Sequence, residues 1–203
     1  MNKTWEKEYS IRYRLHANEL KWLYCELYHN DMGAYDYFTE MLYRMWLERP
    51  EKLKMMDRAR EECPDWYKGH EMVGMLMYVK PFAGNLQGVR KKLDYIAECG
   101  VNYLHLMPLL ESPEGRSDGG YAVSDFRKVQ PELGTMEDLA ELAADCHERG
   151  IALCLDFVMN HTSEDHEWAR RARAGEEELQ HRYFFYDDWS LSTLSAQNDV
   201  NLM

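Results

Sequence analysis

The sequence predicts an α/β protein in which a helical segment is followed by alternating strands and helices. Residues 1–69 place apolar side chains at helical spacing, whereas short apolar runs typical of buried strands begin after Gly69. Amphipathic stretches separate these runs and end at glycines, which commonly terminate helices. Apolar strands joined by helices pair in parallel through right-handed crossovers, so three β/α units are expected after the helical segment.

Two apolar stripes indicate helices in residues 1–69. The stripes are Leu20, Leu23, Tyr24, Leu27 and Tyr28, then Phe38, Met41, Leu42, Met45 and Trp46. Pro50 suits the first position of a third helix, and Pro64 and Gly69 then break the pattern. We interpret the aromatic stripes as the core of a helical domain that ends near residue 69.

The β/α units can be delimited from residue 72 onward. Strands are expected at 72–80, 101–109 and 151–159, and helices at 85–100 and 135–150. Thr135 is a good N-cap for the second helix, and Gly100 and Gly150 are good stops. The links that follow the strands are the longer ones, and both barrels and open α/β sheets bind ligands at that end of the strands.

Composition narrows the classes of function. The chain has 203 residues, a formal charge of −12 and 45% hydrophobic residues, so it can bury a core. The excess of acid argues against a nucleic-acid or anionic-membrane partner. The five cysteines form no Cys-x-x-Cys pair, and no apolar run is long enough for a signal peptide or a membrane span. A reducing, cytoplasmic location is therefore expected, and no organic cofactor is indicated.

Two motifs after the strands carry a family resemblance. "DGGY" covers Asp118–Tyr121, and "DFVMNH" covers Asp156–His161. With "FAGNLQGV" at residues 82–89, they resemble the α-amylase superfamily, glycoside hydrolase family 13, and within it the amylosucrases. The resemblance runs roughly from Trp5 to Trp189.

The resemblance implies a more specific domain organisation. Residues 1–69 would be an N-terminal all-helical domain. Residues 70–189 would form the first three β/α units of an incomplete TIM (β/α)8 barrel, and 190–203 an atypical tail.

The resemblance also implies roles for five residues. Asp156, at the end of the third strand, would orient charged groups of the catalytic centre, and His161 would donate a hydrogen bond to a glucosyl hydroxyl. Asn160 would brace the loop, Tyr121 would be the aromatic platform for the sugar ring, and Asp118 would close the base of the pocket.

Each of these residues also has a purely structural interpretation. Asp156 could anchor a loop, His161 could be an ordinary hydrogen-bonding residue, Tyr121 could be core, and Asp118 could be a turn residue. A metal site built from Asp156, His161 and His166 is not expected, because the two histidines are not spaced to share one helix face.

No catalytic carboxylate is predicted in this chain. The family takes its nucleophilic Asp, its acid/base Glu and a third Asp from strands four, five and seven, which would lie beyond the last residue. A whole barrel takes about 250 residues. We therefore expect a truncated or partial chain whose uncovered strand edges favour self-association.

The resemblance implies part of a retaining, sucrose-acting glucosyltransferase or glycosidase that makes an α-glucan, with sucrose and α-glucan as partners. Two alternatives stay open. One is a fragment of an oligo-α-glucosidase or trehalose synthase. The other is a non-catalytic sugar-binding or interaction module completed by another chain.

Overall fold

A computed structural model describes residues 3–186, 188, 190 and 193–194. They divide into two units, Met1–Gly69 and His70–Met203, which are described separately. The predicted tail at 190–203 falls outside the described residues except for 190, 193 and 194. Within the described ranges, no helix combines the length and apolar composition needed to span a bilayer.

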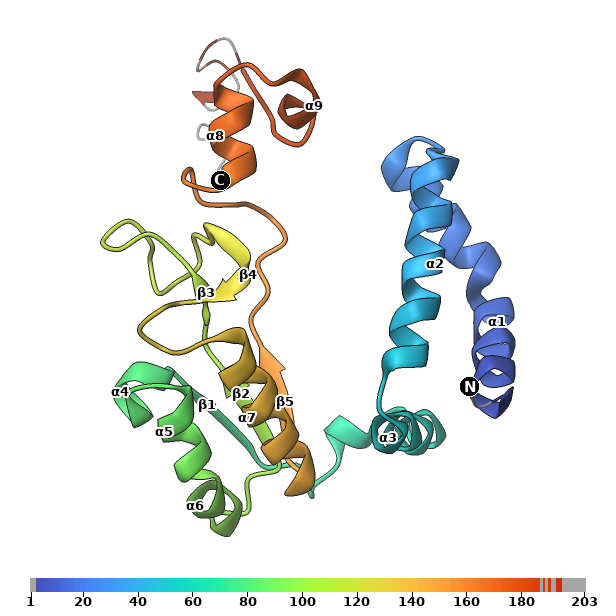
Figure 1. The fold of residues 1–203 in the computed structure, drawn as a ribbon, viewed down its shortest axis with the longest axis vertical. Helices are drawn as coiled ribbons and strands as arrows, with labels where there is room; N and C mark the ends of the chain where they lie inside the picture. Colours follow the sequence, from blue (N-terminus) through green and yellow to red (C-terminus); the bar gives the residue numbers. More distant parts are fainter. Residues whose placement is uncertain (1–2, 187, 189, 191–192, 195–203) are drawn as a thin grey trace. The chain divides into compact units, whose positions relative to one another are not determined.

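The first unit consists of helices. They are α1 (Lys3–Tyr28), α2 (Met32–Glu48), α3 (Glu51–Glu62) and the short 3₁₀ helix η1 (Trp66–Lys68). Helices α1 and α2 run side by side (Figure 1). The Trp5 and Trp46 rings meet edge to face with centroids 6.3 Å apart, and Trp46 Nε1 donates to the carbonyl of Trp5 at 2.9 Å. From the two predicted stripes, Trp46 makes this contact and Tyr24 stacks on Phe38 at 5.8 Å, but Leu23, Leu27, Tyr28 and Met45 are exposed, so the stripes are only in part the core that was expected.

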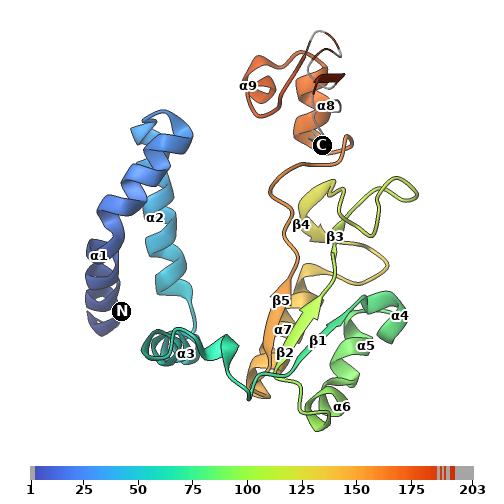
Figure 2. The same ribbon diagram turned by 180° about the vertical axis from the view of Figure 1, so that it is seen from behind.

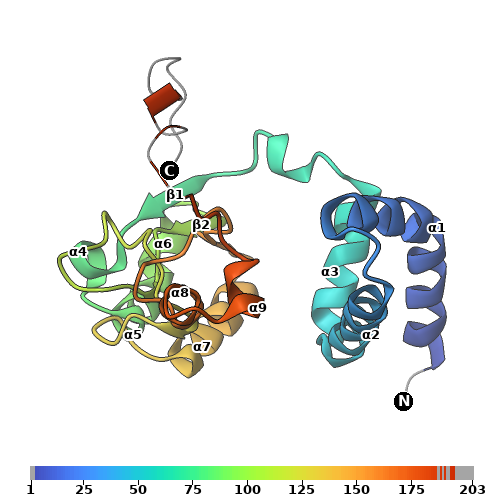
Figure 3. The same ribbon diagram turned by 90° about the horizontal axis from the view of Figure 1, so that it is seen from above.

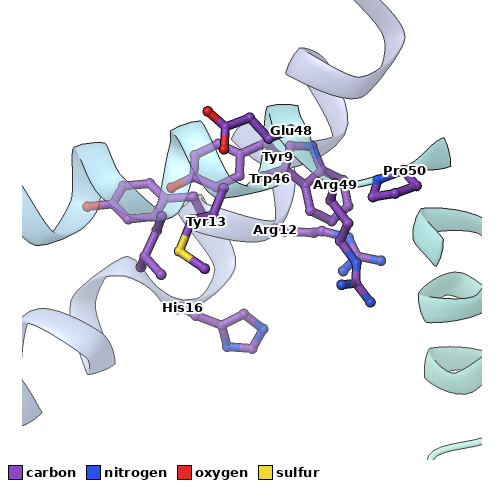
Figure 4. A pocket seen from close by; sticks show the side chains of 10 residues that line it. Tyr9, Arg12, Tyr13, His16, Trp46, Glu48, Arg49 and Pro50 are labelled. Carbon is purple, nitrogen blue, oxygen red and sulfur yellow. The ribbon is translucent and has the colours of Figure 1, made fainter. Parts of the chain in front are cut away.

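An open groove of about 580 Å³ lies along α1 and α2 (Figure 4). Its lining includes the rings of Tyr9, Tyr13 and Trp46 together with two arginines. Both arginines are already engaged. Arg12 pairs with Glu61 at 2.7 Å, and Arg49 makes two bonds to Asp57 at 2.7 and 2.9 Å. The charges in this groove therefore stabilise the helical unit itself.

The second unit contains a parallel sheet with strand order β1-β2-β5. The strands are β1 (Gly74–Met77), β2 (Tyr103–Leu106) and β5 (Ala152–Leu155), and they lie next to one another in Figure 2. Two β/α crossovers join them through α4 (Val79–Ala83), α5 (Leu86–Lys91), α6 (Leu93–Glu98) and α7 (Met136–Glu148). The predicted parallel β/α arrangement, matching the start of a barrel, is confirmed.

One face of this sheet is covered by helices. Seen from above, α5 and α7 lie on the same side of β1 and β2 (Figure 3). Leu104 and Leu106 of β2 are fully buried against Leu86, Val89 and other core side chains. Because side chains alternate along a strand, Tyr103 and His105 point to the opposite face. That face carries the polar residues of the sheet.

The helical region after β1 differs from the predicted elements. The helix expected over residues 85–100 is broken at Lys92 into α5 and α6. A separate short helix, α4, precedes Gly84, and a Cβ at Gly88 would lie 2.0 Å from the carbonyl oxygen of Ala83. Glycine at this position therefore allows α4 and α5 to approach closely.

The long segment expected as a loop at residues 110–134 contains a two-stranded antiparallel sheet. Its strands are β3 (Leu110–Glu111) and β4 (Asp125–Val129), with an irregular register between Leu110 and Glu111. After β5 come α8 (Glu167–Arg173) and α9 (Glu177–Gln180).

Candidate functional site

A cluster of polar side chains lies at the carboxyl ends of β2 and β5. Asp156 directly follows β5, and one of its carboxylate oxygens is 2.9 Å from Nε2 of His105. The other oxygen accepts a hydrogen bond from the Tyr121 hydroxyl at 3.1 Å. Two side chains, one from β2 and one from a loop, thus meet at the single carboxylate that follows β5.

The loop that carries Tyr121 depends on two glycines. Gly119 and Gly120 have φ values of 61° and 93°, where a side chain would be strained. A Cβ at Gly119 would lie 2.8 Å from the Tyr78 hydroxyl oxygen, and one at Gly120 would lie 3.0 Å from Pro108 Cβ. The two glycines therefore let the loop approach the ends of β1 and β2, and this brings Tyr121 to Asp156.

Tyr121 is partly open to solvent, with 37% of its surface exposed. Partial desolvation raises its pKa above 10, and the hydrogen bond to Asp156 and the charge of that carboxylate raise it further. The phenol therefore stays protonated at neutral pH and acts as the donor to Asp156. Its exposed ring area could pack against a sugar.

The side chains of His161 and Asn160 contact each other rather than the residues bonded to Asp156. Both are exposed, and the Asn160 side-chain nitrogen is 3.3 Å from Nδ1 of His161. This contact is between the side chains of two consecutive residues. The role of His161 toward a glucosyl hydroxyl stays a prediction, as does the bracing role of Asn160.

Asp118 is exposed, and its carbonyl accepts a hydrogen bond from the Tyr121 N–H at 3.2 Å. It therefore takes part in the turn that presents Tyr121, which was the structural alternative for this residue. A cavity of about 280 Å³ borders Gly119 and Gly120, with Tyr78 and Pro108 among its other lining residues. The pocket-closing role of Asp118 stays a prediction.

Ion pairs hold the loops after β2 and β5 together. Arg116, in the loop before Tyr121, bonds Glu164 at 2.9 Å and also pairs with Asp165. A backbone hydrogen bond of 2.8 Å from the Ser163 N–H to the Val123 carbonyl joins the same two loops. The segments bearing Tyr121 and His161 are therefore tied to each other by contacts outside the cluster.

Two residues near the cluster were not among the site residues predicted from the sequence. His105 sits inside an apolar strand, and its alternation with Leu104 and Leu106 was the signal that it faces away from the core. Tyr78 follows β1 and approaches Gly119. Its position at the carboxyl end of a strand was the available signal.

Among the residues that the structure describes, no group of three or more His, Cys, Asp or Glu side chains is placed to hold a metal ion. His166 has a local role, because its Nδ1 accepts a hydrogen bond from the Trp168 N–H at 3.1 Å and so caps α8.

A parallel β/α sheet with a carboxylate, a tyrosine and a histidine gathered at the carboxyl ends of its strands is typical of the class of β/α-barrel proteins, whose sites lie at that end. Residues 35–198 match the family model described as "Alpha amylase, catalytic domain". The chain belongs to this family, in keeping with the resemblance of its motifs.

Characterised relatives share the same region. The chain is 38% identical over 128 residues to an oligo-1,6-glucosidase of Bacillus cereus, covering 60% of this chain and 22% of that protein. It is 49% identical over 90 residues to the trehalose synthase/amylase TreS of Mycolicibacterium smegmatis, covering 44% of this chain and 15% of that protein. The chain thus spans about a fifth of the length of such relatives.

Solved structures agree on the fold. A trehalose-6-phosphate hydrolase of Bacillus licheniformis superposes with a TM-score of 0.55 at 34% identity, over 63% of this chain and 23% of the other. The trehalulose synthase MutB of Pseudomonas mesoacidophila gives a TM-score of 0.55 at 33% identity, over 62% and 23%. These comparisons carry the family assignment but do not single out amylosucrases.

Proposed function

We propose that this chain supplies part of the glucosyl-binding subsite of a retaining α-glucoside-cleaving enzyme. The observation that carries this proposal is the convergence of Tyr121 and His105 on Asp156 at the carboxyl ends of the strands. An aromatic ring beside fixed hydrogen-bonding groups suits a neutral sugar, which offers an apolar C–H face and hydroxyls. The acidic net charge does not oppose such a ligand.

Asp156 fits the role of an anchor better than that of a nucleophile. Each of its oxygens contacts a hydrogen-bonding side chain, and together these two contacts hold the carboxylate in one orientation. A retaining mechanism needs a nucleophile and an acid/base about 5 Å apart. In our proposal those groups come from other parts of the enzyme, and this chain binds and orients the glucosyl unit.

As the specific donor we propose sucrose, with an α-glucan as acceptor, on the strength of the "DGGY" and "FAGNLQGV" motifs and the helical unit before the barrel. A second candidate is favoured by the relatives, whose names are oligo-1,6-glucosidase and trehalose synthase. In that case isomaltose-type or trehalose-type glucosides would replace sucrose. For either donor we propose a cytoplasmic location, which the five free thiols support.

The test is saturable binding by the 203-residue chain. Sucrose, isomaltose and trehalose would be titrated separately, with fructose as a sugar lacking the glucosyl unit, and binding followed by calorimetry and by tyrosine NMR signals. We expect the glucosides to bind and fructose not to bind. Preference for sucrose supports the amylosucrase-like donor, whereas preference for isomaltose or trehalose supports the second candidate.

Tyr121→Ala should weaken glucoside binding roughly tenfold. Loss of the contact between the ring and the sugar should cost about 1.4 kcal/mol of binding free energy. Tyr37→Ala is the matched control, since Tyr37 is a 66% exposed tyrosine of α2 in the helical unit. If both variants and the unaltered chain bound glucosides with equal affinity, Tyr121 would not be part of the subsite. Absence of saturable binding to any glucoside would contradict the proposed function.

A further inference from the structure

His105 is a polar side chain on the face of the sheet that α5 and α7 do not cover. It lies in a row of residues, one from each strand, that is otherwise apolar. The register places it between Leu76 of β1 and Cys154 of β5. Its neighbours along β2, Leu104 and Leu106, are completely buried on the helix-covered face. The His105 side chain is 26% exposed, so a hydrogen bond within the protein replaces contacts with water that most of the ring has lost.

The partner lies diagonally across the strands. Asp156 is two residues beyond Cys154, so it projects from the same face of the sheet as His105. Two residues along a strand and one strand across amount to about 8 Å between backbones. The imidazole bridges this distance through its far nitrogen, Nε2, which lies 2.9 Å from Oδ1 of Asp156. A shorter side chain could not reach.

Two donors thus fix the orientation of one carboxylate. An ionised aspartate only accepts hydrogen bonds, so Nε2 carries the proton in this contact. The Tyr121 hydroxyl donates to the second oxygen at 3.1 Å. Rotation of the carboxylate would break both bonds together, so the position of the Tyr121 ring is coupled to His105 through Asp156.

We propose that His105 is a positioning residue of the glucosyl subsite, which holds the Asp156 carboxylate so that Asp156 in turn fixes the ring of Tyr121. The sugar-binding part of this inference rests on the proposed function. His105 itself need not touch the sugar. Its contribution is the Nε2–H donor at the far end of a planar side chain, and the choice of substitutions follows from that.

The experiment compares three substitutions of His105 in the 203-residue chain. Gln can place an amide N–H near the position of Nε2, Asn places its amide nearer the backbone, at the level of Nδ1, and Phe keeps the ring shape without a donor. The readouts are the NMR signals of labelled tyrosine, with the Tyr121 signal assigned from Tyr121→Phe, and the affinity for sucrose. His70→Gln and His70→Phe are matched controls at an exposed histidine.

We expect His105→Phe to shift the Tyr121 signal and to weaken sucrose binding about fivefold, the effect of one lost charge-assisted hydrogen bond acting indirectly. His105→Gln should restore both readouts to within about twofold, whereas His105→Asn should not. The His70 variants should match the unaltered chain. A residue with a merely structural role would lower the melting temperature without this difference between Gln and Asn.

Two results would overturn the inference. One is an unchanged Tyr121 signal in His105→Phe, and the other is equal rescue by Asn and Gln. The Gln and Asn comparison holds even if His105→Phe does not fold. If no glucoside binds the unaltered chain, the proposed function fails, but the Tyr121 signal still tests the coupling between His105 and Tyr121.

Discussion

His166 is a buried histidine whose ring begins a helix. Nδ1 accepts the Trp168 N–H, and the ring lies edge-on to Phe126 and Trp168 at centroid distances of 5.7 and 5.1 Å. Burial lowers its pKa below 6.5, and Arg127 acts in the same direction. The charges of Asp125 and Glu167 oppose this shift but do not reverse it. The neutral ring is thus the form that caps α8.

This predicts a loss of stability in mild acid. Because the pKa of His166 is lower in the folded than in the unfolded protein, the unfolded state binds the extra proton first. The stabilisation is present above about pH 6.5 and is lost as the pH falls through the folded pKa. His166→Asn keeps a capping acceptor without titrating, so it should flatten this part of the stability profile.

The measurement is urea unfolding from pH 7.5 down to pH 5. His181→Asn serves as a control at an exposed histidine that follows α9. The same acid slope in His166→Asn and in the unaltered chain would show that another group is responsible.

At the scale of elements, α7 begins with a complete capping box. Thr135 Oγ1 accepts the Asp138 N–H at 3.1 Å, and Asp138 accepts the Thr135 N–H at 2.8 Å. Asp138 also accepts from Gln87 of α5 at 2.5 Å, and these contacts, that with Gln87 foremost, hold the pKa of its carboxyl below the usual value. The start of α7 is therefore linked to the neighbouring helix as well as to itself.

Thr135→Ala should lower the free energy of unfolding by about 1 kcal/mol, because it removes the acceptor for one backbone N–H. Thr135→Ser keeps the hydroxyl and should recover most of the loss. Urea unfolding at neutral pH measures both changes. If alanine and serine variants were equally stable, the cap would not contribute to folding.

The sequence predicted strands and long helices better than it predicted their interruptions. Apolar runs and glycine stops located the three parallel strands, and Thr135 was recognised as a cap. The break at Lys92 was missed, because the amphipathic pattern continues across it. The β3–β4 pair was missed because two residues of β3 are too few to show any alternation.

The residues of the site could likewise be predicted only in part from the sequence. Asp156 and Tyr121 were selected through their motifs, and the structure brings them together. His105 was not selected, because its importance depends on the register between β2 and β5, which no local pattern encodes. His161 was selected, and its place relative to the sugar stays a prediction.

At the scale of the molecule, the second unit leaves apolar side chains uncovered. Leu76 is 62% exposed on β1, and Phe157 and Met159, which follow β5, are 62% and 86% exposed. Within the described part of the chain, β1 and β5 each pair on one side only. Open strand edges beside apolar side chains favour pairing with another copy.

We therefore expect self-association that increases with concentration. Met159→Lys should weaken it about tenfold, because the ammonium group would have to be desolvated in the contact. Met55→Lys, at a 63% exposed methionine of α3, is the matched control and should have little effect. Sedimentation velocity over a hundredfold concentration range distinguishes these outcomes. A monomer at all concentrations would contradict the prediction.

The separation of His105 and Asp156 along the chain has a consequence during synthesis on the ribosome. The two partners are 51 residues apart, so His105 is synthesised well before the aspartate. Until then the first two strands can pair while their imidazole lacks its acceptor. This hydrogen bond can therefore form only after the whole of the third strand, which precedes Asp156, has been synthesised.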